Sequence, residues 1–180
     1  MRWPRLAGVP DFLAWEEEQE QRFEFGEGQV SLMPGASARH EIVVVNVLLA
    51  LRRAVNDPAA VRGPGMKVLT ESSSRYPDAT VTLDPRDSLD LTYVRYPTLL
   101  VEVLSPRTHA LDRGTKFDEY RTIEELAEYL LVDSRRRWTQ ALRRHAEGWL
   151  VGFPKRAGDV ELASIDATIG IDELYAGTGL

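Results

Sequence analysis

One apolar run that contains a single acidic residue constrains this chain more than any other feature. The run is Thr98–Leu104, and the acidic residue is Glu102. A strand that is apolar along almost its whole length is usually covered on both faces, so this segment is expected to be a central strand. Ionised glutamate there loses hydration worth on the order of several kcal/mol unless a partner or a pKa shift compensates. The sequence therefore allows three roles for Glu102: a buried ion pair with an arginine, a carboxylate facing a solvated groove, or a metal ligand.

Helical patterns occur on both sides of this strand. Apolar spacing, capping residues and an initial proline predict helices over Pro10–Gln19, Ile42–Val55 and Asp112–Arg121, with a helical turn at Ile171–Tyr175. Ser37 is expected to cap the second helix, whose apolar circumference predicts a central position. Its β-branched run Val43-Val44-Val45 leaves a strand as the alternative. The acidic stretch Glu16–Glu20 is expected to face solvent.

Strand patterns complete the predicted fold. Turn residues and alternation predict a hairpin of Arg22–Phe25 with Gln29–Met33 that ends at Pro34, strands at Met66–Thr70, Thr80–Leu83 and Tyr129–Val132, and a hairpin of Trp138–Leu142 with Trp149–Phe153. Together these elements predict a mixed α/β (α+β) fold, with a mixed central sheet flanked by helices and an N-terminal helix and hairpin. With 180 residues, 43% of them hydrophobic, a single domain over 1–180 is expected.

Composition narrows the possible chemistry. The chain has no cysteine, which excludes disulfides and thiolate metal sites, and His40, His109 and His145 lack ligand spacing. Any metal is therefore expected to be held mainly by carboxylates. The net charge of −6 argues against passive, histone-like adhesion to nucleic acid. No window approaches the roughly 20 apolar residues of a membrane span, so a soluble cytoplasmic protein is expected.

A second carboxylate is available to join Glu102. Asp78 follows Tyr76-Pro77 and stands just before a predicted strand, from which it can face the neighbouring strand that carries Glu102. The alternative is an ordinary Pro-Asp turn. In phosphodiester hydrolysis, Mg²⁺ or Mn²⁺ held by hard oxygen ligands polarises the phosphate and lowers the pKa of an attacking water. A pair of carboxylates suits that requirement.

Two basic side chains are candidates for the same site. Lys116 stands one helical turn after Asp112, where it forms either an exposed ion pair or a cation that stabilises phosphoryl charge. His40 falls in the first turn of the long helix, where packing or capping is the alternative to a role in the site.

Several motifs, in this order, resemble one known family. The motifs are Glu24 followed by Gly26-Glu27-Gly28, Gly35-Ala36-Ser37 with His40, Tyr76-Pro77-Asp78, Val101-Glu102-Val103-Leu104-Ser105-Pro106, Asp112-Arg113-Gly114 through Lys116 and Tyr120, and Glu128-Tyr129-Leu130-Leu131-Val132-Asp133. The chain resembles, through roughly Pro10–His145, the Uma-two-type restriction endonucleases, a bacterial branch of the PD-(D/E)XK nuclease superfamily.

The resemblance implies a restriction-endonuclease-like core and a set of roles. Asp78 and Glu102 would bind the metal, Lys116 would be the catalytic lysine, and Glu24 would be an accessory acid from the N-terminal region. One position departs from the superfamily pattern: Leu104 stands two residues after Glu102, where a lysine is usual. The lysine would then come from the following helix, as Lys116.

The leading hypothesis is an endonuclease that hydrolyses DNA phosphodiester bonds with Mg²⁺ or Mn²⁺. One alternative is a catalytically inert member of the same fold that binds nucleic acid or a protein, motivated by the acidic charge and the missing in-strand lysine. Another is an enzyme that uses the same carboxylates on a small phosphate ester. Cutting both strands of a duplex favours paired sites, which is compatible with a homodimer.

Two arginine clusters complete the list of candidates. Arg135-Arg136-Arg137 and Arg143-Arg144 could contact phosphates along a duplex. On hairpin strands they could equally form solvated edges that resist aggregation, and the pattern favours that second interpretation slightly.

Overall fold

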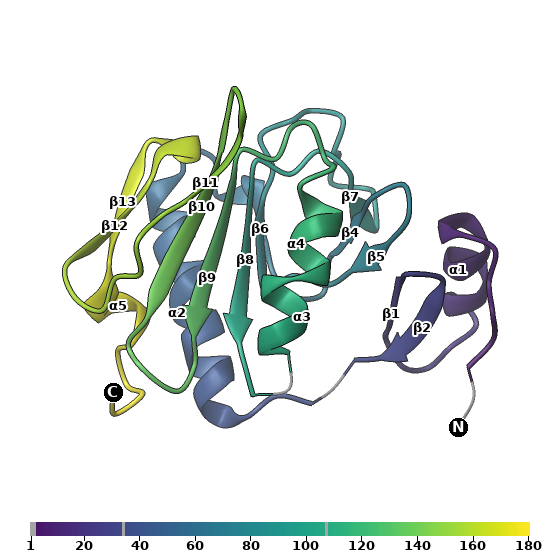
Figure 1. Ribbon diagram of the computed structural model, residues 1–180, viewed down its shortest axis with the longest axis horizontal. Helices are drawn as coiled ribbons and strands as arrows, with labels where there is room; N and C mark the ends of the chain where they lie inside the picture. Colours follow the sequence, from purple (N-terminus) through teal and green to yellow (C-terminus); the bar gives the residue numbers. More distant parts are fainter. Residues whose placement is uncertain (1–2, 34, 107) are drawn as a thin grey trace.

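A computed structural model describes residues 3–33, 35–106 and 108–180, with His109 described by its backbone alone (Figure 1). The strand end expected at Pro34 lies outside these residues. The described helices are α1 (Val9–Glu16), α2 (Ala38–Ala54), α3 (His109–Arg113), α4 (Thr115–Tyr120), α5 (Ile171–Leu174), η1 (Pro58–Ala60) and η2 (Ala163–Ile165).

A mixed sheet forms the centre of the molecule. Among the described residues its strands follow the order β11 (Gly148–Val151), β10 (Thr139–His145), β9 (Glu128–Asp133), β8 (Leu99–Leu104), β6 (Ala79–Val81) and β3 (Val61–Arg62). β8 and β9 run parallel and the other neighbours antiparallel. The predicted hairpin at one edge of the sheet is confirmed as β10 and β11, and the neighbouring strands β8 and β9 are connected through helices. The apolar run with Glu102 is the fully buried strand β8.

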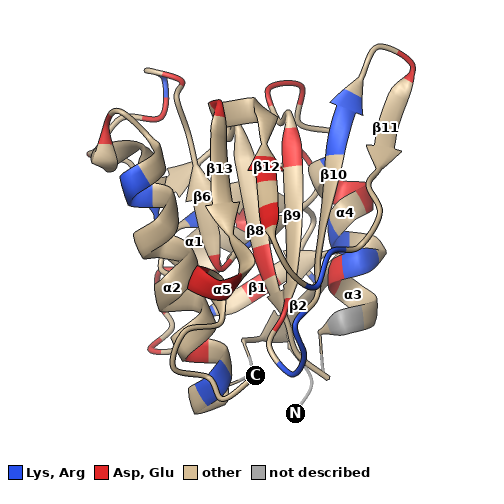
Figure 2. Ribbon diagram, turned by 90° about the vertical axis from the view of Figure 1, so that its left-hand side faces the viewer, with Lys and Arg blue, Asp and Glu red and all other residues tan. Residues whose placement is uncertain are grey.

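Helices cover both faces of this sheet, as the side view in Figure 2 also shows. α2 packs on one face, in a core that includes Val101 and Val103 of β8. α3 and α4 lie on the other face, where Tyr120 packs in a core with Leu100. Because strand side chains alternate between faces, Glu102 points to the side of α4. A buried charge thus stands between a sheet and a short helix.

A smaller sheet lies on the N-terminal side of the molecule (Figure 1). Its order is β2 (Gln29–Leu32), β1 (Phe23–Gly26), β5 (Ser74–Arg75), β4 (Lys67–Leu69) and β7 (Tyr93–Val94). The ring of Phe12 in α1 stacks on Phe25 with 5.4 Å between ring centroids. The predicted N-terminal helix and hairpin are confirmed.

The strands expected at Met66–Thr70 and Thr80–Leu83 belong to different sheets. The first is β4, in the smaller sheet, and the second is β6, in the larger one. The polar segment between them contains a further strand, β5, which pairs with both β4 and β1. The chain then crosses from one sheet to the other through residues 76–78. This crossing brings both sheets to the candidate site.

The helix predicted over Asp112–Arg121 is two shorter helices. α3 begins earlier, at His109, and Gly114 separates it from α4. Glycine has a low helix propensity, and a Cβ at Gly114 would lie 3.1 Å from the carbonyl oxygen of Ala110. The break changes the direction of the chain just before Lys116.

The central position predicted for α2 is wrong. The helix itself is confirmed over the strand alternative, and the Ser37 hydroxyl caps it by accepting a hydrogen bond from the His40 amide. Val47 and Leu51 are buried, but the opposite face is open to solvent and exposes Ile42, Val45 and Leu49. Apolar residues on both sides of a helix do not show which side the sheet covers.

Two further predictions need correction or addition. Glu16 is buried rather than solvated, because its carboxylate accepts hydrogen bonds from the Phe23 amide and the Tyr76 hydroxyl and pairs with Lys67.

The C-terminal hairpin of β12 (Asp159–Leu162) and β13 (Ala167–Gly170) was not predicted, whereas the helical turn after it is confirmed as α5. No helix in the described part of the chain is long and apolar enough to cross a membrane.

Candidate functional site

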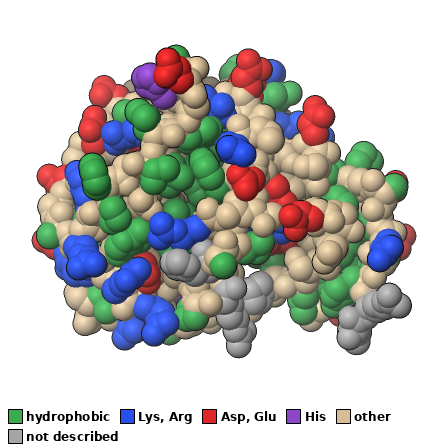
Figure 3. Space-filling view, in the orientation of Figure 1, with side chains coloured by type: hydrophobic (Ala, Val, Ile, Leu, Met, Phe, Trp, Pro, Cys, Tyr) green, Lys and Arg blue, Asp and Glu red, His purple; other side chains and the backbone are tan. Residues whose placement is uncertain are grey.

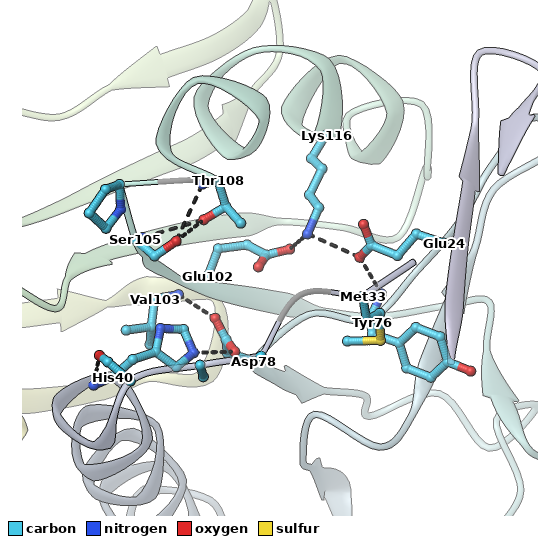
Figure 4. Close-up of a pocket in the computed structure, with 14 residues that line it drawn as sticks. Glu24, Met33, His40, Tyr76, Asp78, Glu102, Val103, Ser105, Thr108 and Lys116 are labelled. Carbon is cyan, nitrogen blue, oxygen red and sulfur yellow. Dashed lines mark hydrogen bonds and ion pairs between the residues drawn. The ribbon is translucent and has the colours of Figure 1, made fainter. Parts of the chain in front are cut away.

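The register between β6 and β8 brings the two predicted carboxylates together. Ala79 pairs with Val101, so the next position along the antiparallel ladder sets Asp78 beside Glu102. Asp78 Oδ2 accepts a hydrogen bond of 2.6 Å from the backbone amide of Val103. Asp78 therefore stands directly before β6, with its carboxylate beside the end of β8 (Figure 4).

Glu102 is buried with few compensating contacts. Its side chain accepts hydrogen bonds at Oε1 from Lys116 Nζ and from the Tyr120 hydroxyl, both at 3.1 Å. Burial raises the pKa of Glu102 well above its usual value, and the charge of Lys116 only partly opposes this. The nearby carboxylates of Asp112, Asp78 and Glu24 raise it further. An added cation would relieve this concentration of negative charge.

Lys116 is the ammonium group at the centre of these carboxylates. Its Nζ lies 3.1 Å from Glu102, 3.2 Å from Glu24 and 3.3 Å from Asp112. Burial opposes its charge, but the three carboxylates outweigh burial and raise the pKa of Lys116, so the side chain keeps its proton. The exposed helical pair with Asp112 that the sequence allowed is wrong, because both side chains are buried.

Asp112 was not predicted as a site residue. Its two carboxylate oxygens are buried, and Lys116 contacts Oδ1 as an ion pair. Burial raises the pKa of Asp112, and Lys116 and the Thr108 side chain only partly oppose this effect. Two sequence signals point to its position: the spacing of four residues to Lys116 and the Asp112-Arg113-Gly114 motif of the family resemblance.

Glu24 joins the site from the other sheet. Its Oε1 accepts the backbone amide of Tyr76 at 3.1 Å and lies beside Lys116, while Oε2 accepts from Arg75 Nη1 at 3.3 Å. Glu24 is buried between the two cations. The accessory acid implied by the resemblance is therefore connected to Lys116 directly (Figure 4).

Sequence analysis also missed the ion pair that holds Arg75. Its guanidinium donates two hydrogen bonds of 2.7 Å to Glu119 of α4, a bidentate arrangement in a buried position. A Cβ on Gly26 would lie 2.0 Å from Arg75 Nη2 and 2.4 Å from Glu119 Oε1. Gly26, expected only as a turn residue, thus leaves the space that this ion pair occupies.

His40 lies at the edge of the site. Its Nε2 is 3.2 Å from Asp78 Oδ1, and its backbone amide takes part in the cap of α2. Burial disfavours the charged ring, but the hydrogen bond and charge of Asp78, with smaller effects of Glu41 and Asp112, raise the pKa of His40 above 6.5. Capping and contact with the predicted site therefore occur together at this residue.

A cavity of about 440 Å³ connects the predicted residues. All five of them line it: Glu24, His40, Asp78, Glu102 and Lys116. The close-up in Figure 4 shows them converging from both sheets and from α2 and α4. The structure thus brings together all five of these residues, whereas neither arginine cluster lines this cavity.

The donor chemistry fits a hard divalent cation. Asp78 and Glu102 offer carboxylate oxygens to the cavity, in surroundings with more carboxylates than cations. Within the described ranges, however, no group of three or more His, Cys, Asp or Glu side chains is arranged to hold a metal. Mg²⁺ commonly uses one or two protein carboxylates and completes its shell with water and substrate phosphate. Asp78 and Glu102 match the number of carboxylates that such a site commonly uses.

The two arginine clusters have different surroundings. Arg143 pairs with the buried Glu128 at 2.7 Å. Arg144 donates to the backbone carbonyls of Arg121, Ile123 and Leu126. Arg144 is exposed and Arg143 is partly exposed, as expected, but β10 is not an edge strand because it lies between β9 and β11. Arg135-Arg136-Arg137 instead occupy the turn between β9 and β10.

Comparisons with known proteins identify the family of this chain. Residues 9–163 match the Uma2 family, described as "Putative restriction endonuclease". An uncharacterized protein of Synechocystis sp., slr1290, is 33% identical over 179 residues, which cover 97% of this chain and 94% of that protein. A second uncharacterized protein of the same organism, sll1609, is 32% identical over 134 residues, or 72% of this chain and 76% of that protein.

One solved structure matches almost the whole chain. It is the crystal structure of a "putative nuclease belonging to DUF820" from Anabaena variabilis, with a TM-score of 0.78 and 16% sequence identity. The match covers 96% of this chain and 99% of that chain. The predicted restriction-endonuclease-like fold, a mixed sheet flanked by helices, is confirmed.

Proposed function

The chain belongs to the Uma2 family, and from this premise we propose that it is an endonuclease that hydrolyses DNA phosphodiester bonds with the help of Mg²⁺ or Mn²⁺. The observation that carries the proposal is the meeting of Asp78, Glu102 and Lys116 in one cavity. Carboxylates from neighbouring strands can share a cation, and a buried ammonium beside them can stabilise an anionic transition state.

Each residue has a distinct role in this proposal. Asp78 and Glu102 would hold the metal, which when bound polarises the phosphate and lowers the pKa of the attacking water. Lys116 keeps its proton and donates to the charge that develops on the phosphoryl oxygens. Glu24 anchors the Lys116 ammonium, and His40 orients Asp78 through Oδ1.

The experiment compares two aspartates that receive the same substitution. Mn²⁺ is titrated calorimetrically into the wild type, Asp78→Asn and Asp87→Asn, and plasmid nicking is measured for each. Asp87 is a matched control, since it is buried and accepts backbone hydrogen bonds from Arg95 and Tyr96 in a separate loop. Asp78→Asn is expected to weaken metal binding and to slow nicking by about 10²-fold or more. Equal nicking by wild type and Asp78→Asn, or nicking that survives a chelator, would contradict the proposal.

A second candidate function is a catalytically inert member of the fold that binds nucleic acid or protein. The observation in its favour is that Asp78 and Glu102 already have partners, in His40 and Lys116, while no larger group of metal ligands is found in the described ranges. Duplex binding by the wild type without metal uptake or cleavage would support this candidate over the nuclease.

A further inference from the structure

A second cavity lies next to the candidate site. It has a volume of about 550 Å³ and shares Ser105 and Pro106 with the first cavity. Its other lining residues come from the end of β8, from α3 and from the β9–β10 turn, and they include Arg135 and Arg136. The two cavities therefore meet around the turn that follows Glu102.

The β9–β10 turn is organised by one aspartate. Asp133, the last residue of β9, accepts the Arg135 amide at Oδ1 and Arg136 Nε at Oδ2, both at 2.9 Å. These contacts fix the turn and one guanidinium, while the Arg135 side chain remains exposed. The Asp133 carboxylate thus binds the backbone of Arg135 and the guanidinium of Arg136.

A third arginine approaches the same turn from α3. Arg113 donates to Gln140 Oε1 at 3.0 Å, and its guanidinium lies 4.9 Å from the ring centroid of Trp138. The guanidinium of Arg136 lies 5.8 Å from the same ring. Two guanidiniums near one indole repel each other, and a bound anion would reduce that repulsion. Asp133 pairs with Arg136 alone among the three arginines, so positive charge remains in excess here although the chain has a net charge of −6.

We propose that Arg113, Arg135 and Arg136 form a subsite for backbone phosphates of a nucleic-acid strand that continues past the candidate site. The inference rests on the proposed function and adds the place where the polymer is held. Guanidinium groups suit phosphate because their planar fork donates two hydrogen bonds and is weakly hydrated. Figure 3 shows basic side chains gathered over the β9–β10 turn, at the lower left of the face drawn.

The other arginine cluster does not serve this purpose. Arg143 pairs with two carboxylates, those of Glu128 and Glu161, and Arg144 donates to three backbone carbonyls. The subsite would bind phosphate without regard to base identity, since contacts to the sugar-phosphate backbone position a duplex but do not read its sequence. It would therefore contribute affinity rather than cleavage specificity.

The test measures duplex binding without divalent metal, so that no cleavage is required. Fluorescence anisotropy with a labelled duplex gives Kd over a range of salt concentrations for the wild type and for Arg135→Ala/Arg136→Ala. The double variant is expected to bind about tenfold more weakly, and the slope of log Kd against log salt should fall by about 2, because roughly one counterion is released per phosphate contact. Arg135→Lys/Arg136→Lys should keep most of the slope.

A matched control removes two arginines from the last turn of α2, away from the proposed subsite. Arg52→Ala/Arg53→Ala should leave both Kd and the salt slope as in the wild type, and thermal melting checks that every variant is folded. An unchanged slope in Arg135→Ala/Arg136→Ala, or no duplex binding by the wild type, overturns the subsite. Duplex binding with the expected slopes but no nicking after metal is added would leave the subsite standing and would contradict the proposed nuclease.

Discussion

Glu102 and Glu128 are buried glutamates on neighbouring parallel strands, yet their surroundings differ. The side chain of Glu128 has both oxygens engaged: Oε1 accepts from Arg143, and Oε2 accepts from the amide and hydroxyl of Ser164. Glu102 accepts at Oε1 only, among the described residues, and lines a cavity shared with other carboxylates. The exposed fractions, 3% for Glu102 and 0% for Glu128, do not distinguish the two.

This comparison distinguishes a carboxylate with a structural role from a candidate metal ligand. Glu128 has the arginine ion pair that the sequence allowed as one explanation for Glu102. Its hydrogen bonds compensate for the lost hydration. Glu102 instead shares the Lys116 ammonium with two other carboxylates, and burial raises its pKa. A carboxylate that shares its cation beside a cavity, rather than burial alone, marks the candidate ligand.

The largest expected effect separates the two glutamates by activity. Glu102→Gln keeps the shape of the side chain but removes the charge that would hold a metal, so plasmid nicking should fall by about 10²- to 10⁴-fold. Glu128→Gln should nick at nearly the wild-type rate. It should instead lose about 1–3 kcal/mol in the free energy of unfolding, measured by urea denaturation, because hydrogen bonds to a charged group are weakened. Equal nicking rates for Glu102→Gln and Glu128→Gln would contradict the distinction between a candidate metal ligand and a structural carboxylate.

The next prediction concerns the cation that accompanies each glutamate. Lys116→Met removes the ammonium beside Glu102, and nicking should fall by about 10²- to 10³-fold because phosphoryl charge is no longer stabilised. Arg143→Met removes the partner of Glu128 and should lower thermal stability while activity persists. A Lys116→Met variant that is folded and fully active would show that Lys116 serves only to neutralise its neighbours.

A smaller effect is expected from Gly26, which touches neither glutamate. Gly26→Ala should displace the Arg75–Glu119 pair, because its Cβ would fall 2.0 Å from Arg75. Glu24 and Lys116 would then lose their support, and kcat should fall by about 10- to 100-fold, the range seen when a supporting contact is lost. KM for the duplex should change little.

Gly63→Ala is the matched control for Gly26→Ala. Its Cβ would meet only a Leu48 methyl group at 3.6 Å, an ordinary contact. If kcat and KM of Gly26→Ala are those of the wild type and only its thermal stability falls, the Arg75–Glu119 pair has no influence on the site.

The smallest effect is a difference in the pH dependence of stability. The pKa of Glu102 is raised in the folded state, so this group contributes stability below its unfolded pKa and loses that contribution as the pH rises through the folded pKa. Above pH 4.5, the wild type should lose stability relative to Glu102→Gln by up to about 1 kcal/mol per pH unit. Urea denaturation at several pH values measures the difference, and a parallel pH dependence of the two proteins would contradict it.

Local patterns were sufficient to predict several parts of the molecule. The apolar run of residues 98–104 identified the central strand, and Ser37 identified the start of α2. Asp78 was proposed as the partner of Glu102 because a residue at a strand entry can face a neighbouring strand, and the register of β6 and β8 then sets the two side by side. Periodicity, capping and turn chemistry act over a few residues, and the sequence displays them directly.

Long-range contacts decided the rest. The sequence by itself determined the central strand, the carboxylate within it and the order of the motifs, because each depends on residues close together in the chain. Only the tertiary structure decided that Glu16 is buried, that Arg75 reaches Glu119, and that Gly26 leaves space for this ion pair. Arg75 and Glu119 are far apart in sequence, and a buried charge finds its partner only when separate elements pack together. No local pattern encodes that choice, because the residues that flank a buried arginine or glutamate in the sequence can equally flank an exposed one.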